Sequence, residues 1–322
     1  MDREAVVYMD IAGAPVLVGR LWSRIRKQRE NGTFEYDASW LKRADRFALE
    51  PALILSEGPY HTGVDQPMFG AIGDSAPDRW GRMLMRRAER RAAEREGRQS
   101  RTLFEIDFLL QVDDEARAGA LRFAEKEGGP FLAEADKFRI PPIVELNRLL
   151  AAAERVIDDK DDEEDLRLLI APGSSLGGAR PKASVRDKDG RLSIAKFPHK
   201  DDSSNVVLWE GVALTLAARA RISVAQWHIA QVGKKACLIL RRFDRKDGER
   251  IPLLSAMSML GSSDNEKNHT YLEIAEALRQ QGASPNDDLQ ELWRRIVFNV
   301  LISNTDDHLR NHAFLYESQK GW

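Results

Sequence analysis

The sequence predicts an α+β fold with two lobes and an additional strand-rich subdomain at the amino terminus. Alternating apolar residues at positions 6–9 and 16–21 predict strands at the start of the chain. A glycine-rich stretch at 172–182 precedes a second group of strands, and helical periodicity dominates from residue 253 onward. A chain of 322 residues is long enough for two or three domains with hydrophobic cores. We predict an amino-terminal subdomain at 1–125, a strand-rich lobe at 126–245 and a partial helical lobe at 246–322.

Composition limits the class of protein. Hydrophobic residues make up 43% and charged residues 31%, which is typical of globular proteins, and the net charge of −2 gives no general attraction to nucleic acid or membranes. No apolar run approaches the ~20 residues that a membrane-spanning helix needs. The single cysteine, Cys237, excludes an internal disulfide and a cysteine-based metal cluster. Together with an amino terminus that lacks a signal-peptide pattern, it predicts a cytoplasmic protein.

The amino-terminal third combines strands with an arginine-rich helix. Strands are predicted at 6–9, 16–21 and 32–36, followed by a short helix at 38–41. Asp74 or Ser75 is placed to cap a helix that begins near Pro77. Seven arginines follow between residues 79 and 95, but glutamates are interleaved and no set of aromatic residues accompanies them. We therefore expect a solvated helix face and no direct binding of nucleic acid.

The middle of the chain contains a conspicuous acidic run. A helix is predicted at 103–111, a strand at 119–123 and a helix at 143–157. Residues 158–165 then include seven carboxylates. Consecutive carboxylates repel one another, so this run predicts a solvated linker or a helix start and not a metal site.

The glycine-rich stretch that comes next has the composition of a phosphate-binding loop. Glycine and small hydroxyl residues leave backbone N–H groups free to approach phosphates. The loop is not of the Walker A type, because no G-K-[ST] closes it. A hairpin follows, and its second strand, 192–197, carries Lys196 among apolar neighbours. In kinases, a lysine in such a strand contacts the nucleotide phosphates and pairs with a glutamate of a nearby helix, and Lys196 has the position expected for this lysine.

The expected partner of Lys196 is Glu210. It lies in a helix that begins after Ser203-Ser204-Asn205, and two strands and a possible hinge at 241–243 follow. A surface glutamate is the simpler interpretation of Glu210 by itself. The order of loop, lysine strand, glutamate helix, two strands and hinge matches the amino-terminal lobe of a kinase.

In the carboxy-terminal part of the chain, a polar loop follows a predicted amphipathic helix. Apolar residues recur at helical spacing from 289 to 301 and predict a packed helix. Asp306 and Asn311 follow with the D-x-x-x-x-N spacing of a kinase catalytic loop, in which the Asp accepts the substrate hydroxyl proton and the Asn binds Mg²⁺. This spacing alone is weak evidence for a catalytic loop. The kinase-like order of the preceding loop, strands and helix strengthens it.

The ordered motifs resemble those of the HipA-type Ser/Thr kinases, the toxins of bacterial HipA/HipB toxin–antitoxin modules. The matching segments cover nearly the whole chain and lie at 34–41, 69–82, 119–123, 175–182, 195–198, 242–245 and 304–311. The resemblance implies a kinase-like fold with an added amino-terminal subdomain. It also implies phosphorylation of a protein such as an aminoacyl-tRNA synthetase, a HipB-like DNA-binding antitoxin as partner, and ATP with Mg²⁺ as cofactors.

The resemblance also implies individual roles. Asp306 would be the catalytic base and Asn311 a Mg²⁺ ligand, and Glu210 would pair with Lys196. Ser175 falls where the family has an autophosphorylated serine that switches the kinase off, with Ser174 as the near alternative. The residues expected to bind ATP are Ser175, Leu176, Gly177, Gly178, Ala179, Lys182, Lys196, Arg241, Phe243 and Asp244.

The resemblance further places a second Mg²⁺ ligand, an Asp of D-F-G type, shortly after Asn311. The printed chain ends at Trp322 before such a residue. The expectation is therefore an incomplete helical lobe that exposes apolar surface and lacks one metal ligand. This leaves open an active kinase, an inactive truncated kinase that binds an antitoxin or another partner, and, less favoured, a small-molecule kinase of the aminoglycoside-phosphotransferase type.

Overall fold

The computed structural model describes residues 2–63, 66–133, 140–170, 178–263, 266 and 268–322. Its contacts divide the chain into two compact units that are discontinuous in sequence. Unit 1 comprises residues 1–75, 118–132 and 246–322, and unit 2 comprises residues 76–117 and 133–245. The predicted division into domains at residues 125 and 245 stays a prediction.

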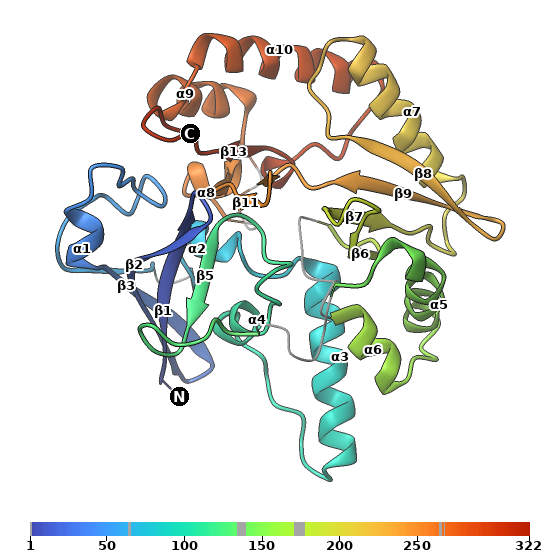
Figure 1. The fold of residues 1–322 in the computed structure, drawn as a ribbon, viewed down its shortest axis with the longest axis horizontal. Coiled ribbons are helices and arrows are strands. Elements are labelled where there is room, and N and C mark those ends of the chain that lie inside the picture. The colour runs from blue at the N-terminus through green and yellow to red at the C-terminus, as the bar shows by residue number, and fades with distance from the viewer. Residues whose placement is uncertain (1, 64–65, 134–139, 171–177, 264–265, 267) are drawn as a thin grey trace. The chain divides into compact units, whose positions relative to one another are not determined.

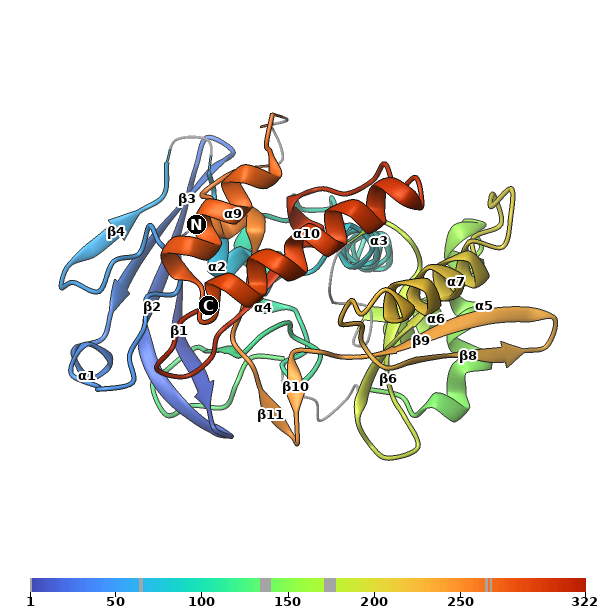
Figure 2. The same cartoon turned by 90° about the horizontal axis from the view of Figure 1, so that it is seen from above.

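Unit 1 is built on a five-stranded antiparallel sheet in the order β4-β3-β2-β1-β5 (Figure 1). Its further elements include a two-stranded sheet of β12 and β13 and the adjacent helices α9 and α10, orange to red in Figures 1 and 2. The elements are β1 (Asp2–Ile11), β2 (Ala14–Arg26), β3 (Arg29–Tyr36), α1 (Ala38–Leu41), β4 (Pro59–His61), α2 (Gly70–Gly73), β5 (Leu121–Ala124), β11 (Glu249–Arg250), β12 (Leu253–Ser255), α8 (Ala256–Met259), α9 (Tyr271–Gln281), α10 (Pro285–Leu301), η2 (Leu309–Asn311) and β13 (Ala313–Leu315).

Strand β1 lies between β2 and β5 in this sheet and is buried over six consecutive residues. A register shift in its pairing with β2 lies between Val7 and Tyr8. Opposite Val7, Gly19 allows a close approach of β2 to β3, since a Cβ atom there would lie 2.1 Å from the Glu35 carbonyl oxygen.

Unit 2 contains a four-stranded antiparallel sheet in the order β6-β7-β9-β8 with helices on both faces. Residues of β9 alternate between the two faces: Cys237 and Ile239 pack toward α5 and α6, whereas Ala236 and Leu238 pack toward α7. The elements are α3 (Arg79–Arg95), α4 (Glu105–Leu110), η1 (Ile143–Glu145), α5 (Leu146–Ile157), α6 (Glu163–Ile170), β6 (Lys182–Arg186), β7 (Leu192–Lys196), α7 (Val206–Arg219), β8 (Trp227–Val232) and β9 (Lys235–Arg241). A short ribbon of β10 (Arg245–Lys246) and β11 follows where the chain passes from unit 2 to unit 1.

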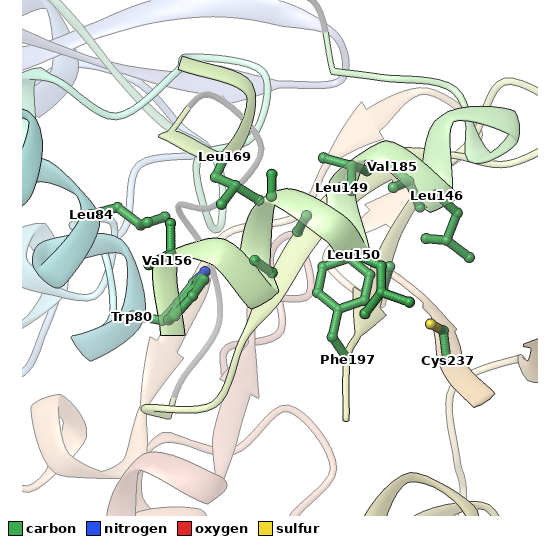
Figure 3. Packing of buried hydrophobic residues seen from close by; sticks show 14 of the residues in the cluster. Trp80, Leu84, Leu146, Leu149, Leu150, Val156, Leu169, Val185, Phe197 and Cys237 are labelled. Atoms are coloured by element: carbon green, nitrogen blue, oxygen red, sulfur yellow. The ribbon is translucent and has the colours of Figure 1, made fainter. Parts of the chain in front are cut away.

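The main core of unit 2 joins α3, α5 and α6 to the sheet. Figure 3 shows Trp80 and Leu84 of α3 meeting Val156 of α5 and Leu169 of α6, while Phe197 packs at the other end of the cluster. All five side chains are at most 3% exposed. This core holds the end of β7, and with it Lys196, in a fixed place.

The start of α3 corrects one expectation. Asp78, and not Asp74 or Ser75, is the N-cap, and its carboxylate accepts the N–H of Gly81 at 2.8 Å. Asp74 instead accepts the N–H and hydroxyl of Ser255 in unit 1 at 2.6 and 2.8 Å. Two Asp residues within five positions offer equivalent capping patterns, so local sequence does not separate them.

The arginine face of α3 and the acidic run are less solvated than expected, because they pair with each other. Arg87 donates to the Asp161 carboxylate at 2.6 Å, and Asp161 is only 1% exposed in its side chain. Arg95 pairs with Glu163 at 2.6 Å. The acidic run thus starts α6 and neutralises part of α3.

A buried carboxylate in unit 1 makes stability depend on pH. Glu50 is 4% exposed and accepts the N–H of Ala71 at 2.5 Å. Burial, reinforced by the nearby Asp74 charge, raises its pKa from 4.5 to about 7. The folded protein therefore holds this proton to a higher pH than the unfolded chain does.

Between these two pKa values the folded state binds more protons, so stability falls as pH rises. Relative to Glu50→Gln, we expect the free energy of unfolding of the wild type to drop by roughly 3 kcal/mol between pH 4 and 8. Urea denaturation of both proteins across this range measures the difference, and a constant difference would contradict the burial argument.

Candidate functional site

Lys196 and Glu210 form the ion pair expected from the sequence. Lys196 is the last residue of β7, and its Nζ contacts the Glu210 carboxylate on α7. The two side chains are 36% and 33% exposed, so the pair is reachable from solvent. Helix α7 begins with a side-chain cap from Asn205 and packs on β9 through Val207. The fold therefore holds an accessible ammonium group with its charge partner in unit 2.

Lys182 lies next to Lys196 but has a different environment. The two lysines are directly opposite each other in the β6–β7 pairing. The Lys182 Nζ is buried and donates to the Asp78 carboxylate at 2.6 Å and to the Gly178 carbonyl at 3.2 Å. Burial lowers the pKa of Lys182 and raises that of Asp78, while their mutual attraction opposes both changes. Lys182 therefore tethers the described end of the glycine-rich stretch to the start of α3.

The glycine-rich stretch is described only from Gly178 onward. Ser175, Leu176 and Gly177, expected to bind ATP, lie outside the described residues, as does Ser174. Gly178 has a φ of +98°, which favours glycine, and a Cβ atom there would lie 3.3 Å from the Lys182 Nζ.

The residues after Gly178 lie toward solvent. Ala179 is exposed, and the neighbouring Arg180 forms an ion pair with Asp202.

The expected hinge has one exposed aromatic residue and one inaccessible carboxylate. Phe243 is 45% exposed, and Arg241 donates to the Gln226 side chain at 2.8 Å. Asp244 is fully buried, and its carboxylate pairs with Arg242 at 2.5 Å and Arg245 at 2.8 Å. The Asp244 side chain is thus unavailable to a ribose in this structure, whereas the Phe243 ring is accessible.

The loop after α10 presents Asp306 to solvent. Within the described residues the Asp306 carboxylate has no hydrogen-bond or ion-pair partner, and the residue is exposed. Its backbone is held on both sides: its N–H donates to Asn304 Oδ1 at 3.3 Å, and its carbonyl accepts from Asn311 Nδ2 at 2.6 Å. The D-x-x-x-x-N spacing therefore corresponds to a physical link between Asp306 and Asn311.

Asp307 was not singled out from the sequence, although it lies beside the predicted base. Its side chain is only 8% exposed and accepts hydrogen bonds from Tyr271 at 2.6 Å, Asn299 at 2.8 Å and His312 at 3.1 Å. Tyr271 is 36 positions away in sequence, so no local pattern indicates this cluster. The structure thereby distinguishes two adjacent carboxylates, one buried and bonded and one open.

Asn311 is a suitable ligand for a hard cation. Because its Nδ2 is committed to the Asp306 carbonyl, its amide oxygen remains as an acceptor, the type of ligand that Mg²⁺ prefers. In the described ranges no three His, Cys, Asp or Glu side chains converge as a metal site of their own. Phosphate oxygens of a nucleotide would have to complete such a site.

Asp306 belongs to unit 1 and Lys196 to unit 2. Across the described part of the chain, no helix has the length and apolar character needed to cross a membrane.

Comparison with known proteins shows similarity to a HipA-like domain and to two proteins named as candidate kinases. Residues 174–322 match the family model of the HipA-like C-terminal domain. The chain is 25% identical over 339 aligned residues to Y4mE of Sinorhizobium fredii, named as a candidate kinase, covering 94% of this chain and 72% of that protein. A protein of Haemophilus influenzae, also named as a candidate kinase, is 32% identical over 169 residues, covering 45% of this chain and 48% of its own length.

A solved structure shows the same fold. HipA of Shewanella oneidensis MR-1, in a complex of a toxin–antitoxin system with HipB and operator DNA, aligns with a TM-score of 0.60 and 18% identity. The alignment covers 98% of this chain and 73% of that one. The predicted α+β fold of HipA type is thus confirmed.

Proposed function

Because residues 174–322 match the family model of the HipA-like C-terminal domain, we propose that the chain is an ATP-dependent Ser/Thr protein kinase of the HipA type. The observation that carries this proposal is the Lys196–Glu210 ion pair, formed between the last residue of a strand and a helix packed on the same sheet. A kinase requires such a pair to hold the lysine against nucleotide phosphates. The open carboxylate of Asp306 supports the same reaction.

The proposed roles follow from accessibility. The Lys196 ammonium, which is partly exposed, contacts the ATP phosphates. Backbone groups of the glycine-rich stretch approach them as well, and Lys182 acts from its buried position by holding the Gly178 end of that stretch. Phe243 contacts the adenosine part of ATP. Asp306 accepts the proton of the substrate hydroxyl while the hydroxyl oxygen bonds to the γ-phosphorus, and the bond from the γ-phosphorus to the β–γ bridging oxygen breaks, so that ADP leaves.

Magnesium would be held in part by the amide oxygen of Asn311 together with the nucleotide phosphates. When bound, it neutralises negative charge on the transferred phosphoryl group. The chain's own contribution is to orient Asn311, whose amide nitrogen is fixed by the Asp306 carbonyl.

The biological setting that we propose is a toxin–antitoxin pair. The Shewanella protein of the same fold forms a complex with HipB and operator DNA, which supports a HipB-like DNA-binding antitoxin as a partner of this chain. An aminoacyl-tRNA synthetase is the proposed type of protein substrate. Ser175 is the proposed autophosphorylation site, where a phosphate adds about −1.5 to −2 charge beside a loop that holds ATP phosphates and so opposes nucleotide binding.

Replacement of Lys196 by Met is expected to weaken Mg·ATP binding and to lower phosphoryl transfer by about 100-fold or more, because a charge-stabilising contact to the phosphates is lost. Transfer of the γ-phosphate from radiolabelled ATP to the chain itself measures this effect, with peptide mass spectrometry to locate the label at Ser175 or Ser174.

Lys235→Met is the matched control. Lys235 lies in the same unit and pairs with Glu154 on the surface, so its loss removes a similar exposed ion pair without touching the site. Equal labelling in both variants would contradict the role of Lys196.

A second candidate function is a catalytically inactive protein that binds an antitoxin or another partner. The observation that favours it is apolar exposure on α10, where Trp293, Val300 and Leu301 are 66%, 73% and 77% exposed. Binding of a partner without labelling of any protein, at full occupancy of Mg·ATP, would support this candidate over the kinase.

A further inference from the structure

The Asp307 side chain, which is 8% exposed, lies beside the exposed Asp306 and receives hydrogen bonds from three separate segments. Tyr271 is the first residue of α9, Asn299 lies in the last turns of α10, and His312 directly precedes β13. All three donate to the same oxygen, Oδ2, at 2.6, 2.8 and 3.1 Å. One carboxylate therefore joins the segments that flank the catalytic loop on either side.

We propose that Asp307 is a positioning residue that fixes the loop around Asp306 through Tyr271, Asn299 and His312. The inference rests on the proposed kinase function and deepens it, since it concerns how the same site is held. Asp307 itself does not contact substrate or nucleotide in this assignment.

The charge state of Asp307 fits this role. Burial by itself would raise its pKa, but the hydrogen bonds from His312 and Tyr271 outweigh burial, and the pKa is lowered. Reciprocally, the contact with Asp307 raises the pKa of Tyr271 to about 12. An ionised acceptor and neutral or cationic donors make strong hydrogen bonds in a partly desolvated setting.

A second set of contacts extends the network to the backbone of Asp306. Asn299 accepts from Asn304 Nδ2 at 3.2 Å, and Asn304 in turn accepts the N–H of Asp306 at 3.3 Å. Asn311 holds the carbonyl of Asp306 from the other side. The peptide of Asp306 is thus restrained before and after its Cα atom, while its carboxylate stays open to a substrate.

This arrangement also indicates which of the two adjacent carboxylates, Asp306 or Asp307, can act as the general base. A general base must be free to accept a proton from a substrate hydroxyl. Asp307 already accepts three hydrogen bonds, and its side chain is 8% exposed. Asp306 has no such partners among the described residues and is exposed. We therefore assign Asp306 as the general base and Asp307 as the residue that positions it.

The test is Tyr271→Phe, which removes one hydroxyl and keeps the ring that packs edge-on against His312 at 5.9 Å between centroids. We expect kcat for phosphoryl transfer to fall by about 10- to 100-fold, because small displacements of a reacting group cost this much. The KM for ATP should stay within about twofold, since Tyr271 makes no proposed contact with nucleotide. Amide hydrogen exchange at 305–309 should become about 10-fold faster, which reports the loosened loop directly.

Tyr60→Phe is the matched control. The Tyr60 hydroxyl donates to the Ile54 carbonyl at 2.6 Å in the same unit, and its hydrogen-bond partners in the described chain, Ile54 and Ser56, lie outside residues 305–309. We expect it to leave both kcat and exchange at 305–309 unchanged. Asp307→Asn, which keeps one acceptor oxygen and removes the charge, should change both quantities in the same direction as Tyr271→Phe.

The outcomes separate this inference from the kinase proposal. Unchanged kcat or unchanged exchange at 305–309 in Tyr271→Phe would overturn the positioning role. A wild-type chain that transfers no phosphate would overturn the kinase function instead. In that case the exchange measurement still decides whether Asp307 holds the loop: faster exchange supports the network, and unchanged exchange overturns it.

Discussion

Asp306→Asn is expected to lower the rate of phosphoryl transfer by about 100- to 10,000-fold, the range that a positioned general base contributes. Asparagine has nearly the same shape, so the Asn311 contact to the residue 306 carbonyl should persist. Because Asp306 is exposed and its carboxylate has no partner in the described part of the chain, stability should change by less than about 0.5 kcal/mol. Single-turnover transfer from radiolabelled ATP measures the rate, and thermal unfolding checks the fold.

Asp287→Asn supplies a control for the loss of one negative charge. Asp287 is exposed in the first turn of α10, the helix that leads into the same loop. It should leave transfer within about twofold of wild type. If Asp306→Asn retained wild-type transfer, the open carboxylate would have no part in the reaction, and the D-x-x-x-x-N spacing would describe only the Asn311 contact.

The sequence could predict those site residues whose environment is local. A lysine at the end of an apolar strand and a glutamate in the next helix are close in the chain, and the pair of Lys196 and Glu210 is present in the structure. Asp306 and Asn311 are five positions apart, and they too are in contact. In both cases the two residues are close in the sequence, so a short connecting segment limits how far apart they can lie.

Contacts over long sequence separations could not be predicted in this way. Asp78 and Lys182 are 104 positions apart, and Asp307 and Tyr271 are 36 apart. Each pair depends on how separate elements pack, which hydrophobic periodicity does not specify. The arginines of α3 and the acidic run each looked solvated by themselves, and only their packing shows that Arg87 and Asp161 neutralise each other.

Periodicity likewise predicts an apolar stripe without showing what covers it. The stripe on α10 has the expected spacing, but among its residues only Leu292 is buried, while Trp293 and Leu301 are exposed. The stripe is thus only partly packed, in agreement with the expectation that this lobe exposes apolar surface. The amphipathic pattern correctly located the helix that leads to Asp306.

The buried pair of Asp78 and Lys182 gives the largest expected effect on stability. Their side chains are 5% and 4% exposed, and the carboxylate also caps α3 through the Gly81 N–H. Asp78→Asn keeps an oxygen for that cap and removes the charge, so the buried Lys182 cation loses its carboxylate partner. We expect a loss of about 3–5 kcal/mol in the free energy of unfolding at pH 7, compared with about 1 kcal/mol for a lost cap alone. Urea denaturation measures it.

The pH dependence of stability and a double variant show whether Asp78→Asn destabilises the protein through the lost charge or through the altered side-chain contacts. Burial already lowers the pKa of Lys182, and without Asp78 it should fall further. Between the lowered pKa of Lys182 in the folded state and about 10.4 in the unfolded chain, the folded Asp78→Asn protein then binds fewer protons than the unfolded chain, so its stability should rise with pH across that window. Adding Lys182→Met should recover most of the loss at pH 7, because the neutral side chain needs no partner. If the double variant were as unstable as Asp78→Asn, the loss of stability would come from the lost contacts of the Asp78 side chain. It would not come from the lost charge partner of Lys182.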